Sequence, residues 1–205
     1  MSGFGRDAQR TRAGGYSRWV TTIVDLIRGR RLDAELAALL WLLGEGRVPV
    51  HVASPATTPV AEVVRGLASD PALVTDGPGA TIEDVLRQPV PLRPATGAIV
   101  ILDADGRVSS AHLLRPPLRD GAGHIRPQGP AVLAARVEAD DRLEHFAWGV
   151  LPELAEALGR KAGDLEGDIG ERATFLDGLA ATPTTDAAAV ADAIRHWPHL
   201  RQRAN

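Results

Sequence analysis

The sequence predicts an α/β protein, or an α+β protein if its sheet is mainly antiparallel, with helices flanking a central sheet. Two short apolar runs at 48–53 and 97–102 are typical of buried strands. Longer segments with helical spacing separate and follow them, as expected for a sheet covered by helices. Polar turns at 103–106 and 139–141 each join two apolar segments and predict antiparallel hairpins.

The first half of the chain is expected to form, in order, a short amphipathic helix from Ser17, a buried helix at 32–44, a strand at 48–53, a helix at 59–68, a loop at 69–80 and a short helix from Thr81. The helix at 32–44 is apolar almost all round after Glu35, which indicates burial on every side. Thr58 is the expected N-cap of the next helix, and Pro59 is its expected first residue. Proline and glycine are frequent in 69–80, which favours a loop.

The second half is expected to form a strand at 97–102 with a return strand at 107–114, a long loop at 115–130, a hairpin from 131–138 and 142–148, helices at 151–160 and 163–180, and a last helix at 186–197. Helical spacing predicts that the buried positions of the two helices before the linker are Leu154, Leu158, Leu165, Ile169, Phe175 and Leu176. Pro198 is expected to break the last helix.

Charge and composition divide the chain into a flexible basic leader at 1–16, a single α/β domain at 17–180, and a linker with a C-terminal helix and tail at 181–205. Residues 1–31 contain seven arginines and two aspartates, whereas 138–177 contain eleven acidic and four basic residues. No aromatic residues interleave the basic ones in a groove-like pattern, so no nucleic acid is expected as a partner. The acidic helical segment suits either a solvated surface or a protein partner.

Composition excludes several kinds of chemistry. The chain has no cysteine, which rules out disulfides, Cys-ligated zinc, iron–sulfur clusters and thiol catalysis. The first residues are polar, and the most apolar run, at 36–43, is far too short to span a bilayer. A cytoplasmic protein without a membrane span is therefore expected. Lys161 is the only lysine, and together with abundant alanine and glycine this favours a bacterial origin.

The turn between the strand at 48–53 and the next helix has the layout of a phosphate-binding loop. Such a loop needs glycines so that backbone N–H groups converge on the phosphates. It also needs a lysine for the terminal phosphates and a Ser or Thr hydroxyl for Mg²⁺. The turn here reads SPATTPVA at 54–61, with neither glycine nor lysine.

The segment at 30–67 reads RRLDAELAALLWLLGEGRVPVHVASPATTPVAEVVRGL. It resembles the core of bacterial type II/type IV secretion and pilus-assembly ATPases, in which a similar helix and strand lead into a Gly-rich loop with Lys-Thr-Thr. Laid on that pattern without gaps, Ser54 takes the place of the first glycine and Pro59 that of the glycine before the lysine. Val60 stands at the lysine position, and Ala61 stands at the position of the Mg²⁺-binding threonine.

The resemblance covers about 25–177 and continues through GATIEDVL at 79–86 and the segments at 97–116 and 131–159. Residues 69–80 stand where the family has its Walker B strand and catalytic carboxylates. The resemblance therefore implies a reduced RecA-like P-loop sheet, with C-terminal helices, in which the middle of the ATPase core is missing.

Two hypotheses of function follow. In the first, the chain is a non-catalytic, degenerate secretion-ATPase-like domain that acts as a protein-interaction or regulatory module without a cofactor, and a secretion or pilus ATPase homologue is a candidate partner. In the second, it binds a nucleotide or another anion at the 54–62 turn without hydrolysis, with Ser54, Thr57 and Thr58 as weak phosphate ligands and ATP with Mg²⁺ as the cofactor. The first predicts a filled cleft above 54–60, and the second predicts an open pocket with free N–H groups.

A third hypothesis is a metal-dependent enzyme that uses Asp103 and Asp105. The D-x-D-G pattern at 103–106 is also what a tight hairpin turn requires, and the turn is the favoured interpretation. His196 and His199 are three residues apart, but Pro198 between them argues against a shared helical face. No catalytic or metal-binding residue is therefore assigned.

Overall fold

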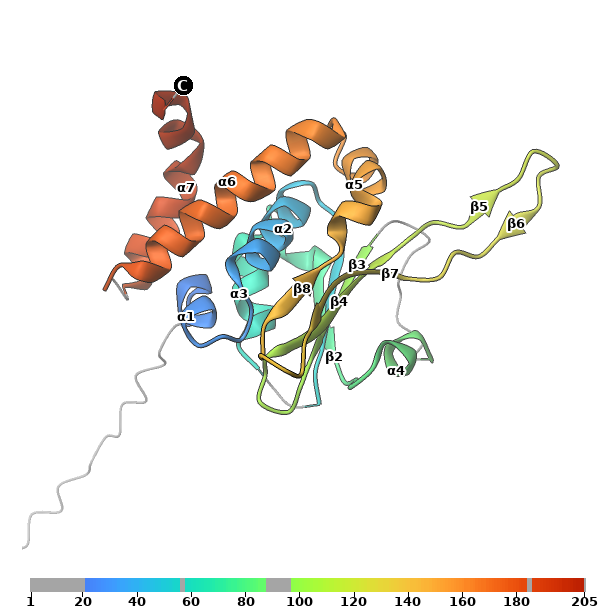
Figure 1. Ribbon diagram of the computed structural model, residues 1–205, viewed down its shortest axis with the longest axis horizontal. Coiled ribbons are helices and arrows are strands. Elements are labelled where there is room, and N and C mark those ends of the chain that lie inside the picture. Colours follow the sequence, from blue (N-terminus) through green and yellow to red (C-terminus); the bar gives the residue numbers. More distant parts are fainter. Residues whose placement is uncertain (1–20, 56–57, 88–96, 184–185, 205) are drawn as a thin grey trace, which may run out of the picture.

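A computed structural model of the chain describes residues 21–55, 58–87, 97–183 and 186–204. At its centre is a six-stranded sheet with the order β2-β1-β3-β4-β7-β8 (Figure 1). The strands are β1 (Val50–Ala53), β2 (Val74–Gly77), β3 (Gly97–Leu102), β4 (Val108–Leu114), β7 (Ala131–Arg136) and β8 (Leu143–His145). Strand β1 runs parallel to β2 and β3, and the remaining neighbours are antiparallel. The sheet is therefore mixed, which confirms the α/β class and both expected hairpins.

The helices are α1 (Ile23–Arg28), α2 (Ala34–Glu45), α3 (Val60–Leu67), α4 (Ile82–Arg87), α5 (Leu151–Ala157), α6 (Ala162–Ala181) and α7 (Ala187–Ala204), with short 3₁₀ turns η1 (Pro71–Leu73) and η2 (Ala147–Val150). Among the described residues, no helix is long and apolar enough to cross a membrane. The expected leader, 1–16, lies outside the described residues. Helices α2 and α3 pack on one face of the sheet and α4 packs on the other (Figure 1).

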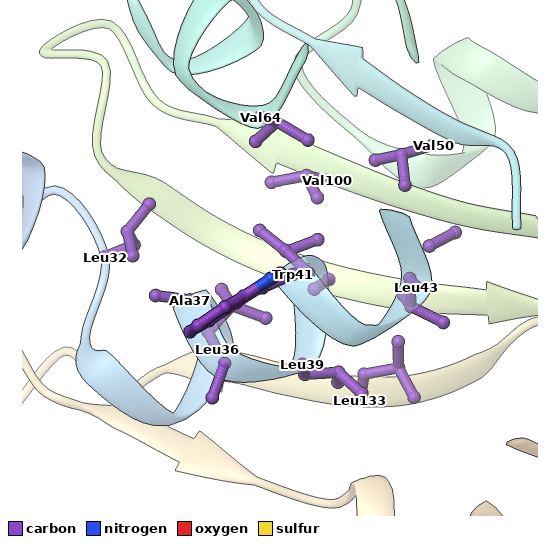
Figure 2. Packing of buried hydrophobic residues seen from close by; sticks show 14 of the residues in the cluster. Leu32, Leu36, Ala37, Leu39, Trp41, Leu43, Val50, Val64, Val100 and Leu133 are labelled. Atoms are coloured by element: carbon purple, nitrogen blue, oxygen red, sulfur yellow. The ribbon is translucent and has the colours of Figure 1, made fainter. Parts of the chain in front are cut away.

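Helix α2 lies between the sheet and α6, and 10 of its 12 residues are buried. Figure 2 shows its side chains beside Val50 and Val100 of the central strands, Val64 of α3 and Leu133 of β7. Its opposite side packs against α6, and there Trp41 forms an aromatic cluster with Phe175 of α6 and Trp197 of α7. The expectation of a helix buried on every side is confirmed.

Both ends of α2 carry polar anchors. Asp33 is the N-cap and accepts a hydrogen bond from the backbone N–H of Leu36 at 2.9 Å. The same carboxylate lies 2.8 Å from Nε2 of His145, the last residue of β8. Burial alone would lower the pKa of His145, but the hydrogen bond and charge of Asp33, with the charge of Glu35, raise it above the ordinary value.

At the other end of α2, the side chain of the buried Arg172 of α6 contacts three residues. Its Nη2 donates to Glu45 of α2 at 2.8 Å, and its Nε donates to the buried Asp168 at 3.0 Å. Its guanidinium also stacks 4.2 Å from the centre of the Trp41 ring. Burial raises the pKa of Asp168, but hydrogen bonds from Arg160 and Arg172 outweigh this and lower it. This network joins α6 to α2 where both are buried.

Four local expectations away from the candidate site are wrong. Residues 74–77 form β2 within the expected loop at 69–80, because parallel pairing with β1 satisfies their backbone although only Val74 is buried. The long loop at 115–130 contains a two-stranded arm, β5 (Leu118–Arg119) and β6 (Ile125–Arg126). Helix α7 continues through Pro198, which costs one backbone hydrogen bond without ending the helix. Leu158 and Phe175 are only partly buried.

Replacing the buried arginine tests the α2–α6 anchor. Arg172→Ala should lower the free energy of unfolding by about 3 kcal/mol, because Glu45 loses its partner on α6 and the buried Asp168 keeps only Arg160 of its two arginine partners. Urea denaturation measures this loss. The control is Arg195→Ala, an exposed residue on α7, which should change stability by less than about 0.5 kcal/mol. Equal midpoints for the two variants would contradict the anchoring role.

The raised pKa of His145 predicts a pH-dependent contribution to stability. Protonated His145 binds Asp33 in the fold, so its contribution is fully present below the unfolded pKa of about 6.5 and is lost as pH rises through the higher folded pKa. His145→Gln should therefore cost more at about pH 5.5 than at about pH 8.5, as measured by urea midpoints. The exposed His196→Gln is the control. A cost for His145→Gln that does not change with pH would overturn the assignment.

Candidate functional site

The turn after β1 lies where the order of the strands places a binding crevice in α/β proteins. The chain passes from β1 through α3 to β2 on one side, and then through α4 to β3 on the other side of β1. Because α3 and α4 pack on opposite faces of the sheet, their connections separate at the carboxyl end of β1. Ligands of such sheets bind at this switch point.

A pocket of about 330 Å³ is present here, and its lining includes Ser54, Pro55, Thr58, Ala61, Asp76 and Gly77. The filled cleft that the first hypothesis predicts is therefore not found, and the open pocket that the second hypothesis predicts is present. The structure brings together two of the three residues expected to bind phosphate, Ser54 and Thr58. The third, Thr57, lies outside the described residues. Residues of the turn and of β2 line the pocket together. Strand β2 belongs to the segment 69–80, which is expected from the sequence to be a loop.

The backbone donors of the turn are only partly free. The N–H of Ser54 donates to the carbonyl of Gly77 at 3.0 Å, so strand pairing continues into the turn. Helix α3 begins at Val60, and Pro59 is its N-cap, so the expected cap at Thr58 is wrong. Proline offers no N–H group, and no side chain caps this helix end. Ala61, from the uncapped first turn, lines the pocket.

The charge of the pocket is acidic. Asp76 lies in its lining, and the carboxylate of this residue pairs with Arg65 of α3. Arg65 itself is not in the lining, and none of the described lining residues is basic. Sequence reasoning missed Asp76 because the 69–80 segment reads as a loop. The signal was the short apolar run ALV at 72–74, directly before Thr75 and Asp76.

In the secretion ATPases that the sequence resembles, a lysine and a Mg²⁺-binding threonine occupy two positions of the loop. The residues at these two positions of this chain lie in different surroundings. Val60, at the lysine position, has no exposed surface and belongs to the main core beside α2. Ala61, at the threonine position, is 5% exposed and has no hydroxyl. The direction of residue 60 is thus set by core packing, and the residue types at both positions differ from those of a phosphate loop.

Asp103 and Asp105 form a hairpin turn, which confirms the favoured interpretation. Oδ1 of Asp103 accepts hydrogen bonds from the N–H groups of Asp105 and Arg107, each at 2.9 Å. Gly106 supplies the left-handed conformation with φ of 73°. In the parts of the chain that the structure describes, no three His, Cys, Asp or Glu side chains gather into a group that could hold a metal ion.

Two histidines lie on the sheet face covered by α4. Nδ1 of His51 lies 2.9 Å from the hydroxyl of Thr75, and Nε2 of His112 lies 2.9 Å from that of Ser110. Burial lowers the pKa of both, and the charges of Asp76 on His51 and Glu83 on His112 oppose this only in part. Both rings are therefore neutral near pH 7. Their surroundings are those of core histidines.

No protein-family model matches this chain, and no curated protein matches it significantly. The resemblance to secretion ATPases consequently stays a prediction from the residues of the sequence.

The hairpin turn beside the pocket can be tested at Gly106. A Cβ there would lie 3.2 Å from Cγ2 of Thr58, and the backbone φ of 73° is strained for any L side chain. Gly106→Ala should therefore cost about 1–2 kcal/mol of unfolding free energy. Gly121→Ala is the matched control, because nothing lies within 4 Å of its Cβ position. A stability of Gly106→Ala equal to that of the control in urea denaturation would argue against the turn.

Proposed function

We propose that this protein is a non-catalytic, degenerate secretion-ATPase-like domain that acts as a protein-interaction or regulatory module. The observation that carries the proposal is the strand-to-helix turn, where a core-packed valine stands at the lysine position and an acidic residue lines the pocket. Phosphoryl transfer depends on positive charge and Mg²⁺ around the transferred group. The described lining offers neither a cation nor a threonine at position 61.

Electrostatics supports the same conclusion. A phosphate in this pocket would approach the carboxylate of Asp76, and like charges a few ångströms apart repel. Arg65 neutralises Asp76 in part, but this pairing occupies the guanidinium. The N–H of Ser54 is also occupied, by Gly77. Binding an anion through Arg65 or through the N–H of Ser54 would therefore require breaking existing contacts.

The interaction half of the proposal is supported by exposed apolar side chains. Six large hydrophobic residues are more than 40% exposed: Leu86, Leu118, Ile125, Val132, Phe146 and Trp148. Two of them, Leu118 and Ile125, lie on the two strands of the arm that projects from the body, one on each face of the arm (Figure 1). Large apolar side chains exposed on a projecting arm are accessible to a protein partner. A secretion or pilus ATPase homologue is one candidate partner.

One observation favours a second candidate function, the binding of a nucleotide or another anion without hydrolysis. A pocket of about 330 Å³ adjoins the uncapped start of α3, whose first-turn N–H groups and helix dipole favour negative charge. The hydroxyls of Ser54 and Thr58 are the side-chain donors in its lining. This candidate needs an anion whose attraction to the helix end exceeds its repulsion by Asp76.

Thermal unfolding of the full chain with millimolar Mg-ATP, ADP or pyrophosphate separates the two candidates. We expect no change in midpoint, because a ligand stabilises a fold only when it binds the folded state preferentially. A reproducible, saturable rise that is lost in Thr58→Glu but kept in the exposed control Thr174→Glu would overturn the proposal. That result would establish anion binding at the turn.

A further inference from the structure

The two faces of the central sheet are covered unequally. One face carries α2 and α3, and α6 packs over α2 (Figure 1). The other face carries α4, a helix of six residues in which Val85 is the buried residue. Val85 packs in a small cluster with Ala53, Ile99 and Ile101 of the sheet. Among the described residues, the attachment of α4 to the sheet is therefore small.

Two buried histidines lie on the thinly covered face. The strand registers place Thr75, His51, Ile99, His112 and Val132 in one row across five neighbouring strands. Residues paired across neighbouring strands point to the same face, and Ile99 belongs to the cluster that packs against α4. His51 is 4% exposed and His112 is 8% exposed. The row ends at Val132, which is 41% exposed, so the cover thins out directly beside His112.

The hydrogen bonds of His51 suit a neutral ring. Its Nδ1 lies 2.9 Å from the hydroxyl of Thr75. Its buried Nε2 has no hydrogen-bond partner within the described part of the chain. A neutral ring can carry its proton on Nδ1, toward Thr75, whereas a protonated ring carries an N–H on both nitrogens. The second N–H would then point at no acceptor, so the closed structure disfavours the protonated form.

Burial also keeps both rings neutral near pH 7. Burial is the largest influence on the pKa of His51 and of His112, and it lowers both. The charge of Asp76 opposes this effect at His51, and that of Glu83 on α4 opposes it at His112, in each case only in part. Asp76 is itself paired with Arg65, which weakens its attraction for a protonated ring.

The other groups that face the two rings add little charge. The neighbours of His112 across the sheet are Ile99 on β3 and Val132 on β7, which are uncharged. The remaining charged side chains of α4, Asp84 and Arg87, pair with each other at 3.7 Å. Glu83 is thus the charged group of α4 that a protonated His112 would attract.

We infer that mild acid releases α4 from the sheet and exposes the apolar face beneath it, while the α2 side of the sheet stays closed. Opening lets water reach His51 and His112, so the open form takes up protons that the closed form excludes. On the α2 side, acid acts with the opposite sign, because Asp33 binds the protonated form of His145. Acid therefore weakens one face and strengthens the other, which confines the opening to α4.

Hydrogen exchange of the Val85 amide, followed by NMR on the full chain, tests the inference. This N–H donates to the carbonyl of Thr81 at 3.2 Å, so it exchanges when α4 opens. Because both pKa values are lowered in the closed form, that form loses stability as pH falls below the ordinary value of 6.5. Carboxylates stay ionised between about pH 7.5 and about pH 5.5, so histidines are the side chains that gain charge.

Over this range, after correction for the intrinsic exchange rate, the opening constant of Val85 should rise several-fold. The ceiling at about pH 5.5 is about tenfold for each histidine. The amide of Leu40 in α2 should keep its protection. A dye that binds exposed apolar surface should become brighter over the same range.

Three variants identify the groups responsible. His51→Gln combined with His112→Gln keeps neutral hydrogen-bonding side chains and should abolish the acid response of Val85, and each single variant should lose part of it. Glu83→Gln, an exposed change, should enlarge the response, because it removes the charge that favours protonated His112 in the closed form. His196→Gln on α7 is the exposed control and should respond like the wild type.

An opening constant that does not change with pH, an acid response that survives in the double variant, or a loss of protection at Leu40 together with Val85 would each overturn the inference. The single variants and Glu83→Gln decide the question even where the double variant is unstable. The proposed function fails on a different result, the saturable thermal shift with nucleotide or pyrophosphate, so the two are decided separately.

Discussion

The rest of the structure depends on the burial of α2. This helix offers no polar face, because nearly all of its residues from Ala34 to Gly44 are buried. It must therefore be covered on opposite sides, and the sheet and α6 provide that cover. A buried arginine on α6 would be costly if it were unpaired, but Asp168, Glu45 and the Trp41 ring surround Arg172. Apolar burial and this polar network together hold α6 against α2.

The same constraint shapes the candidate site. Helix α2 leads directly into β1, and α3 packs back against α2 through Val60 and Val64. This packing turns residue 60 toward the core, where a charged side chain would lose its hydration. The pocket that remains is bordered by β2 and its Asp76. Core packing and pocket charge thus oppose phosphate chemistry for independent reasons.

The sequence predicted the elements whose patterns are strong. The apolar helix at 32–44 and the hairpins follow from local periodicity and turn residues. Strand β2 was missed because it is an edge strand with one buried side chain, and only pairing with β1 defines it. The arm was missed because its two-residue strands lie among prolines and glycines. Ser54 and Thr58 line the pocket, although their binding of phosphate stays a prediction, whereas Asp76 required the sheet topology to be known.

The central claim is that the turn after β1 does not bind phosphate. Amide NMR of the full chain, titrated with pyrophosphate in the presence of Mg²⁺, tests it at single residues. The account predicts that the amide signals of Ser54, Val60 and Ala61 do not move beyond the small, uniform changes of added salt. Saturable shifts confined to these amides and to Thr58 would show an anion at the start of α3 and would contradict the account.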